Sequence, residues 1–237
     1  MPRYDVVLFD ADNTLFDFDR SEREALAGLL RAHGLPGGAA DVALYHKINQ
    51  GLWDRFDRGE VRREWLVVER FRAFLEAAGR QGDPRQLNRE YLRRLGESGH
   101  LLPGAYDLCR SLARCCTLAI VTNGVAVAQR GRFERSPLKE LIPWLFISEE
   151  VGASKPDPAF FAPVLAALGV ADRSRVLMVG DNLLTDIQGG ANAGLDTAWY
   201  RPGHAPRTAG IVPTYEADSY RALEALILNQ TPEYRNK

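Results

Sequence analysis

Short apolar runs rich in β-branched residues recur along the chain, and most of them end directly before Gly, Asp or Asn. Runs of this kind are typical of parallel strands that are buried on both faces of a sheet. The candidate strands are residues 4–9, 117–121, 145–148, 176–179 and 197–200. Their recurrence constrains the fold more than any other feature, because each strand has to be returned to the same end of the sheet by a crossover.

Amphipathic stretches of helical period lie between these runs. They cover residues 105–112, 159–168 and 186–193, and Gly194 follows the last of them at a position where helices commonly end. Strands that alternate with helices predict an α/β fold with a doubly wound, Rossmann-like parallel sheet.

The interval between the first and second candidate strands is far longer than a crossover needs. It contains only helical patterns, separated by glycines. These predicted helices cover residues 21–33, 39–52, 61–78 and 84–95. In the third of them, Val67, Phe71, Phe74, Leu75 and Ala78 form one apolar stripe. We therefore expect an all-helical cap domain over residues 18–99, inserted into a core domain of residues 1–17 and 100–237.

Charge and cysteine usage exclude several kinds of partner and location. Thirty Lys and Arg nearly cancel 31 Asp and Glu, so no bulk field favours a nucleic-acid polymer. No apolar stretch approaches the roughly 18 residues of a membrane span. Cys109, Cys115 and Cys116 cannot build a disulfide framework. We expect a cytoplasmic protein without a membrane partner, and the sequence is compatible with a monomer or a homodimer.

Polar residues gather where the predicted strands end. In an open α/β sheet, ligands bind beyond the carboxyl ends of the strands, so these positions are the candidate site. The residues are Asp10, Asp12, Thr122, Asn123, Gly124, Lys155, Asp181 and Asp186. They come from four segments far apart in sequence, which the predicted fold brings to one edge.

The acids of this set fit a divalent cation and a phosphoryl group. Asp10 is the candidate nucleophile, because a carboxylate can attack phosphorus to form an aspartyl-phosphate. Asp10 and Asp181 are the candidate side-chain ligands of Mg²⁺, with Mn²⁺ as an alternative, and the backbone carbonyl of Asp12 is a further candidate ligand. The Asp12 carboxyl could protonate the leaving alkoxide and then activate water as a general acid/base.

The remaining residues offer hydrogen-bond donors to phosphate. We expect Thr122, the backbone amides of Asn123 and Gly124, and Lys155 to hold the phosphoryl oxygens in the transition state. Asp186 is expected to lie behind the metal ligands and to orient Lys155 or metal-bound water. Its alternative role is the N-terminal cap of the helix that follows.

The runs DADNTL, TNG, SKPDPAFF and GDNLLTD resemble, in order and spacing, the four motifs of the haloacid dehalogenase superfamily. The resemblance extends from Asp5 to about Arg201, and the helical insertion is similar to the family's C1-type cap. It implies an Mg²⁺-dependent phosphatase that works through an aspartyl-phosphate, with the family's roles falling on the residues named above.

The stretches FDADNTLFDFD, INQGLW, ISEEVGASKPDP and VLMVGDNLLTDIQGGANAGLDTAWY resemble a narrower branch, the bacterial 5′-nucleotidases of canonical and noncanonical pyrimidine nucleotides. This resemblance implies a hydrolase of phosphoric monoesters whose small-molecule substrate is a nucleoside 5′-monophosphate. In the cap it rests on the region of Asn49, Leu52 and Trp53. Trp53 and Phe56 have helical spacing, which favours cap core over a platform for a nucleobase.

Three other functions remain open on the sequence. A sugar-phosphate or phosphoglycolate phosphatase, or a phosphomutase, would share every core residue named here and differ only in its cap. A haloacid dehalogenase would resemble the core but lack the second aspartate, so Asp12 argues against it. A non-catalytic binding protein is disfavoured by the complete set of acids, lysine and hydroxyl.

Overall fold

The computed structural model describes residues 1–203 and 210–229, and the chain divides into two compact units. Unit 1, the sheet unit, comprises Met1–Asp17, Leu101–Ala126 and Ser136–Lys237. Unit 2, the helical unit, comprises Phe18–His100 and Val127–Arg135. No helix in the described ranges is both long enough and apolar enough to cross a bilayer.

The sheet unit is built on six parallel strands in the order β3-β2-β1-β4-β5-β6. The strands are β1 (Val6–Phe9), β2 (Thr117–Thr122), β3 (Trp144–Ile147), β4 (Val176–Gly180), β5 (Asp196–Tyr200) and β6 (Tyr215–Ala217). The chain order reverses at β1, which pairs with β2 on one side and β4 on the other. This topology confirms the doubly wound parallel sheet, and it places a topological switch point at the end of β1.

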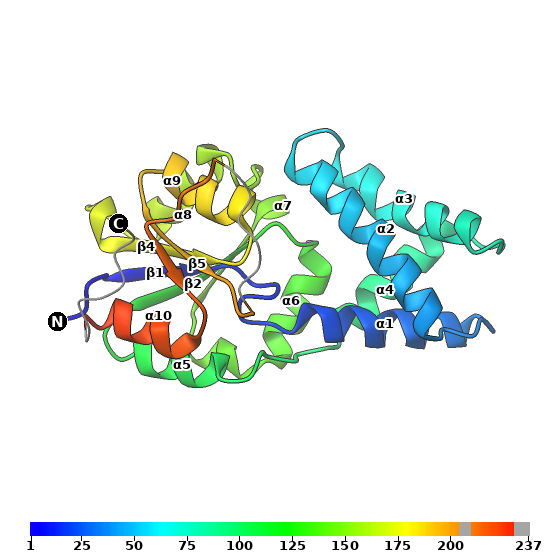
Figure 1. Ribbon diagram of the computed structural model, residues 1–237, viewed down its shortest axis with the longest axis horizontal. Helices are drawn as coiled ribbons and strands as arrows, with labels where there is room; N and C mark the ends of the chain where they lie inside the picture. Colours follow the sequence, from blue (N-terminus) through cyan, green and yellow to red (C-terminus); the bar gives the residue numbers. More distant parts are fainter. Residues whose placement is uncertain (204–209, 230–237) are drawn as a thin grey trace. The chain divides into compact units, whose positions relative to one another are not determined.

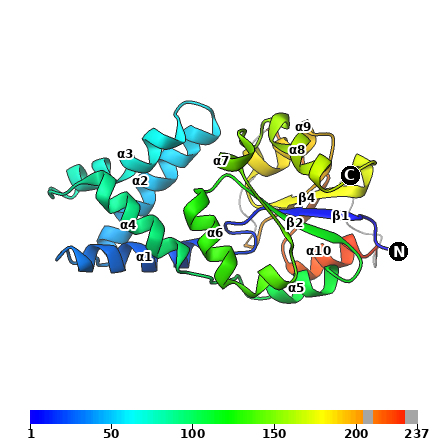
Figure 2. The ribbon, with the colours of Figure 1, turned by 180° about the vertical axis from the view of Figure 1, so that it is seen from behind.

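Helices cover both faces of this sheet. In Figures 1 and 2, α5 and α10 lie on one face and α8 and α9 on the other. The helical segments of the sheet unit are α5 (Ala105–Leu112), η1 (Pro137–Glu140), α7 (Ser148–Val151), α8 (Pro158–Ala167), η2 (Arg173–Arg175), η3 (Leu183–Ile187), α9 (Gln188–Asn192) and α10 (Tyr220–Ile227). Of these, η1 and η2 are 3₁₀ turns and η3 is a π-helical turn.

Alternate residues of each strand pack against opposite helix layers. Val6 and Leu8 of β1 share a buried cluster with Phe160 and Phe161 of α8. Because successive strand side chains point to opposite faces, Val7 of the same strand faces the other layer, and it is fully buried. Burial on both faces explains why the strands appear in the sequence as continuous apolar runs rather than alternating ones.

The helical unit is formed by α1 (Phe18–Ala32), α2 (Ala39–Asp57), α3 (Arg63–Ala77), α4 (Pro84–Gly96) and most of α6 (Ala126–Arg135). Its core contains Tyr45 of α2, Phe71 and Phe74 of α3, and Tyr91 of α4. The ring centroids of Tyr45 and Phe71 are 5.1 Å apart, and those of Tyr45 and Tyr91 are 5.5 Å apart. Phe71, Phe74 and Leu75 of the apolar stripe expected for the third helix are buried, whereas its end members Val67 and Ala78 are half-buried.

Val127–Arg135 belongs to the helical unit, although the sequence analysis assigned this segment to the core. The reason is a close approach between two helices. A Cβ on Gly131 of α6 would lie 2.6 Å from the carbonyl oxygen of Gly96 of α4, so the two backbones touch only because Gly131 has no side chain. Arg135 adds hydrogen bonds from its guanidinium to the carbonyls of Gly96 and Gly131.

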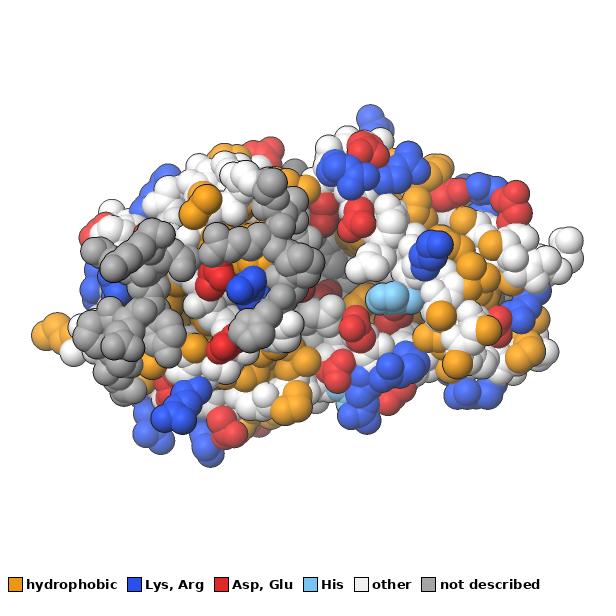
Figure 3. Space-filling model, viewed as in Figure 1, with side chains coloured by type: hydrophobic (Ala, Val, Ile, Leu, Met, Phe, Trp, Pro, Cys, Tyr) orange, Lys and Arg blue, Asp and Glu red, His pale blue; other side chains and the backbone are white. Residues whose placement is uncertain are grey.

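The outer surface of the helical unit carries charges of both signs. On the face shown in Figure 3, basic and acidic side chains are interspersed over these helices. Several of them form exposed pairs at helical spacing, including Arg20 with Glu24 and Arg72 with Glu76. These pairs are typical of a solvated helix exterior.

Candidate active site

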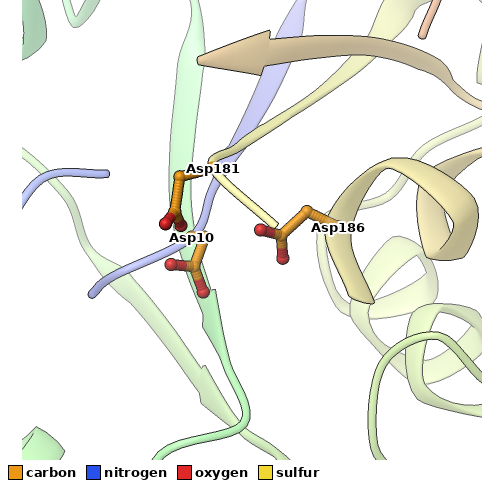
Figure 4. Close-up of side chains that lie close together, drawn as sticks. All are labelled: Asp10, Asp181 and Asp186. Atoms are coloured by element: carbon orange, nitrogen blue, oxygen red, sulfur yellow. The ribbon is translucent and has the colours of Figure 1, made fainter. Parts of the chain in front are cut away.

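The polar side chains predicted from strand ends meet beyond the carboxyl edge of the sheet. Asp10 follows β1 directly, Asp181 follows β4, and Thr122 is the last residue of β2. Figure 4 shows the carboxylates of Asp10 and Asp181 side by side, with Asp186 directed toward them from the π-helical turn η3. These residues surround the topological switch point, where ligands of doubly wound folds bind.

Lys155 lies at the centre of this group and is 2% exposed. Its Nζ donates to Oδ1 of Asp10 at 2.7 Å, to Oδ1 of Asp186 at 2.6 Å and to the carbonyl oxygen of Val121 at 2.9 Å. Burial alone would lower the pKa of this ammonium, but the two carboxylates outweigh it and the net shift is upward. Lys155 therefore stays charged, and its three protons fix it between two acids.

Asp186 uses both of its oxygens inside the protein. Oδ1 accepts from Lys155, and Oδ2 accepts from the backbone amide of Asn182 at 3.1 Å. The side chain packs directly on Gly180, where a Cβ would lie 2.1 Å from Oδ2 of Asp186. Gly180 is thus the position that admits Asp186 to the site.

Asn182, rather than Asp186, caps the helical segment that follows β4. Its Oδ1 accepts from the amides of Leu184 at 2.9 Å and Thr185 at 3.2 Å. The sequence analysis considered Asp186 for this cap, and Asn is equally suited to it. The structure leaves Asp186 in contact with Lys155, which is the first of the two roles considered for it.

The acids can hold a divalent cation. Asp10, Asp181 and Asp186 each offer one carboxylate oxygen, and these oxygens all lie within 4.8 Å of one another. Burial, followed by repulsion from Asp186, raises the pKa of Asp181 to about 7. Burial also raises the pKa of Asp10 well above its usual range, against the opposing effect of Lys155. Two buried carboxylates and the half-buried Asp181 face one ammonium here, so oxygen ligands and excess negative charge both fit a hard cation such as Mg²⁺.

Asp12 is placed differently from the other acids. Among the described residues, its side chain does not join the three-carboxylate cluster, and it is partly exposed. It follows Asp10 by two positions in the loop after β1, where its backbone pairs with Phe16. A partly exposed carboxyl beside the nucleophile suits proton exchange with substrate and water better than it suits a buried ligand.

The segment after β2 supports Lys155 in a way that the sequence did not indicate. The Asn123 side chain donates from Nδ2 to the Lys155 carbonyl at 2.8 Å and accepts at Oδ1 from the Lys155 amide at 2.9 Å. Thr122 is 1% exposed, and its Oγ1 accepts from the Gly124 amide at 3.0 Å. The Gly124 amide, expected to face phosphate, thus donates to Thr122 in this structure and leaves the Thr122 hydroxyl proton available as a donor.

Thr14 is a further residue of the site that the sequence analysis did not single out. It is fully buried, and its Oγ1 donates to Oδ1 of Asp181 at 3.2 Å. The available signal was a hydroxyl residue at the end of the run Asp10-Ala11-Asp12-Asn13-Thr14. Only the fold shows that this hydroxyl meets an acid 167 residues later.

The cap residues compared with nucleotidases have structural contacts inside the helical unit. Asn49 is 2% exposed, donates to Glu22 at 2.7 Å and accepts from Arg70 at 3.2 Å. Trp53 and Phe56 pack edge to face with ring centroids 5.4 Å apart. Both aromatic side chains are half-buried, so they pack against each other at the margin of the helical unit rather than in its core.

Comparison with known proteins agrees with the fold. A model of the haloacid dehalogenase-like hydrolases matches residues 4–194. The chain is 37% identical over 221 residues to the pyrimidine 5′-nucleotidase PynA of Streptococcus pneumoniae (strain ATCC BAA-255 / R6), with 93% of each chain covered. It is 36% identical over 228 residues to the pyrimidine 5′-nucleotidase YjjG of Escherichia coli (strain K12), covering 95% of this chain and 98% of that one.

A third relative has a solved structure. The chain is 39% identical over 231 residues to the HAD hydrolase YfnB of Bacillus subtilis (strain 168), with 97% of each chain covered. The crystal structure of YfnB bound to magnesium matches this fold with a TM-score of 0.90 at 38% identity, over 96% of this chain and 99% of that one. The family model covers most of the chain and the relatives match nearly all of it, so the protein belongs to the haloacid dehalogenase-like hydrolases.

Proposed function

We propose that the protein is an Mg²⁺-dependent phosphomonoesterase that hydrolyses pyrimidine nucleoside 5′-monophosphates through an aspartyl-phosphate. The observation that carries the proposal is the arrangement of Asp10, which has one oxygen held by buried Lys155 and lies beside Asp181 at the sheet's switch point. The nucleotide substrate is supported by the names of the relatives PynA and YjjG. A small-molecule substrate of this kind is consistent with the near-neutral charge of the chain and with work in the cytoplasm.

The first step is attack of Asp10 on the phosphorus of the ester. Lys155 holds Oδ1 of Asp10 at 2.7 Å, which leaves Oδ2 to form the new bond to phosphorus. The bond between phosphorus and the ester oxygen breaks, and that oxygen leaves with a proton from Asp12. The hydroxyl of Thr122 donates to the phosphoryl oxygens as their charge develops. Lys155, whose three protons are engaged by Asp10, Asp186 and the Val121 carbonyl, stabilises that charge through its positive field rather than through a direct hydrogen bond.

The second step hydrolyses the acyl phosphate on Asp10. Asp12, now ionised, removes a proton from water, the resulting hydroxide attacks phosphorus, and phosphate leaves as the Asp10 carboxylate is regenerated. Bound Mg²⁺, held by Asp10 and Asp181 with the Asp12 carbonyl, would neutralise the repulsion between the carboxylates and the phosphate. We assign choice of the leaving group to the helical unit, Phe18–His100 and Val127–Arg135, because the core residues act only on the phosphoryl group.

The test is phosphate release from a panel of substrates, with and without Mg²⁺. UMP, dUMP and dTMP should be hydrolysed more efficiently than sugar phosphates and phosphoglycolate, and chelation of Mg²⁺ should abolish release. If sugar phosphates rank higher, the substrate assignment fails and the phosphatase assignment survives.

Two substitutions test the steps themselves. Asp10→Asn should abolish phosphate release, because an amide is not a competent nucleophile, and turnover at the wild-type rate would rule out the aspartyl-phosphate. Asp12→Ala should fold and bind Mg²⁺ but lose most of its turnover. Retained turnover in this variant would remove Asp12 from the proton transfers.

A further inference from the structure

Asp181 is fixed at two of its polar atoms, by Trp199 from outside the four sequence motifs and by Thr14 of the first motif. The indole Nε1 of Trp199, on β5, donates to the Asp181 backbone carbonyl at 2.8 Å. The hydroxyl of Thr14, in the loop after β1, donates to Oδ1 of Asp181 at 3.2 Å. One contact fixes the main chain and the other fixes the carboxylate, so together they determine where the second side-chain oxygen points.

Thr14 is itself held by a residue from the C-terminal end of the chain. The phenol of Tyr220 donates to the Thr14 carbonyl at 2.8 Å, and Thr14 is fully buried. Tyr220 is the first residue of α10, and its ring stacks on that of Tyr200 of β5, with centroids 4.9 Å apart and planes 10° apart. Burial raises the pKa of Tyr220, so the phenol remains a neutral donor.

Trp199 is held just as firmly. It is 3% exposed and packs with Leu183 and Ile187 of the π-helical turn η3. The guanidinium of Arg201 lies 4.9 Å from the indole centroid, and Arg201 is itself paired with Glu216 of β6 at 3.1 Å. The indole therefore has little freedom to turn its N–H away from Asp181.

We propose that Trp199 and Tyr220 are positioning residues for the metal site: Trp199 orients Asp181 through its backbone carbonyl, and Tyr220 orients the Asp181 carboxylate through Thr14. Mg²⁺ demands near-ideal octahedral geometry, so the direction of a ligand oxygen affects affinity strongly. Contacts behind metal ligands typically change metal affinity by about 10- to 100-fold when removed. The inference rests on the proposed function, because it takes Asp181 to be an Mg²⁺ ligand.

The experiment measures the dissociation constant of Mg²⁺ by calorimetry on the full-length protein without substrate. Trp199→Phe removes the N–H and Tyr220→Phe removes the phenol while keeping the stacked ring. Each should weaken Mg²⁺ binding by about tenfold. The matched controls are Trp144→Phe on β3, where the indole is 38% exposed, and Tyr106→Phe on α5. The Mg²⁺ dissociation constants of the two controls should lie within twofold of the wild-type value. A Tyr220→Phe dissociation constant within twofold of the wild-type value would overturn the proposal for Tyr220.

A double-mutant cycle tests the route from Tyr220 to Asp181. Thr14→Val removes the hydroxyl that reaches Asp181, and Thr14→Ser keeps it, so Mg²⁺ affinity should fall in the first and recover in the second. In the Thr14→Val background, Tyr220→Phe should raise the Mg²⁺ dissociation constant by less than a further twofold. Trp199→Phe should raise it there by as much as it does in the wild-type background. A full additional loss from Tyr220→Phe would show that it does not act through Thr14.

The calorimetry also separates this inference from the proposed function. If the wild-type protein binds no Mg²⁺, both fail. If the wild type binds Mg²⁺ and Trp199→Phe and Tyr220→Phe, with native circular dichroism, bind it equally well, only the positioning role is refuted. Tyr220→Phe deletes a single oxygen atom and keeps the ring, so it carries the test even if Trp199→Phe does not fold.

Discussion

Gly180→Ala is expected to disable the site by displacing Asp186. An added Cβ would lie 2.1 Å from Oδ2 and 2.3 Å from Cγ of Asp186, and 2.5 Å from its Cβ. Carbon atoms in contact prefer about 3.5–4.0 Å, so the carboxylate has to move by more than about 1 Å. The hydrogen bond from Lys155 to Asp186 is 2.6 Å long and lies at the centre of the site, so it cannot survive a shift of that size.

The expected loss of stability follows from two effects. Overpacking a buried position destabilises by about 1–3 kcal/mol. Loss of a hydrogen bond between charged groups adds about 1.5–3 kcal/mol. Together they lower the free energy of unfolding by about 2.5–6 kcal/mol, which for a chain of this length lowers the melting temperature by about 5 °C or more. Phosphate release should fall as well, because Lys155 is left with Asp10 as its remaining carboxylate partner.

The matched control is Gly51→Ala in α2 of the helical unit. An added Cβ there meets nothing within 4 Å, and α2 extends on both sides of the position. Alanine should therefore raise the free energy of unfolding by about 0.5–1 kcal/mol. Thermal and urea unfolding of both variants provide the measurement. A Gly180→Ala variant as stable as wild type would refute the assignment of Gly180 as the position that admits Asp186.

Three further predictions follow from the site and the helical unit. Since burial raises the pKa of Asp181 to about 7, the metal-free protein should lose stability as pH rises from about 4 to 7. The increase in melting temperature caused by Mg²⁺ should therefore grow over that pH range. A Mg²⁺-induced increase in melting temperature that is constant with pH would contradict this. Asn123→Ala should release the Lys155 backbone, destabilise the protein by about 1–3 kcal/mol and lower kcat more than it raises KM in steady-state kinetics. Arg70→Met should destabilise the helical unit by about 3 kcal/mol in urea unfolding, because it removes the buried guanidinium that donates to Asn49 and Asn88. The control Arg72→Met changes an exposed ion pair, so its free energy of unfolding should stay within about 0.5 kcal/mol of the wild-type value.

The parallel sheet and the proximity of the acidic side chains could be predicted from the sequence. Each prediction needs only a local sequence pattern and a general rule of α/β folds. Asp10, Thr122 and Asp181 each end or directly follow an apolar run, and parallel strands place their carboxyl ends on one edge. Strand β6 gave no such signal. It has three residues, one of them Glu216, and its alignment with β5 depends on Thr214 and Thr197, whose side chains and amides bond across the pair.

The assignment of α6 required information that the sequence does not carry locally. Residues 127–135 follow β2 and precede β3, so continuity placed them in the core. Their membership of the helical unit depends on Gly131 meeting Gly96 35 positions earlier, and two isolated glycines give no sign that they will touch. The two hydrogen bonds between the Asn123 side chain and the Lys155 backbone could not be predicted for the same reason, because they join residues 32 positions apart.

The sequence could not decide between the two roles considered for Asp186, contact with Lys155 and the cap of the helical segment after β4, for a physical reason. Asn182 and Asp186 lie four positions apart, and either could cap a helix or face the site. The available space decides between them, because Gly180 has no Cβ and so leaves room for the Asp186 carboxylate beside Lys155. The Asn182 side chain caps the helical turn, and the Asn182 backbone amide donates to Asp186. The resulting site holds three carboxylates against one ammonium, and burial raises the pKa of Asp10 and Asp181, which opposes the ionised state that catalysis needs. A bound divalent cation resolves that conflict, because it stabilises the same ionised carboxylates that the proposed chemistry uses.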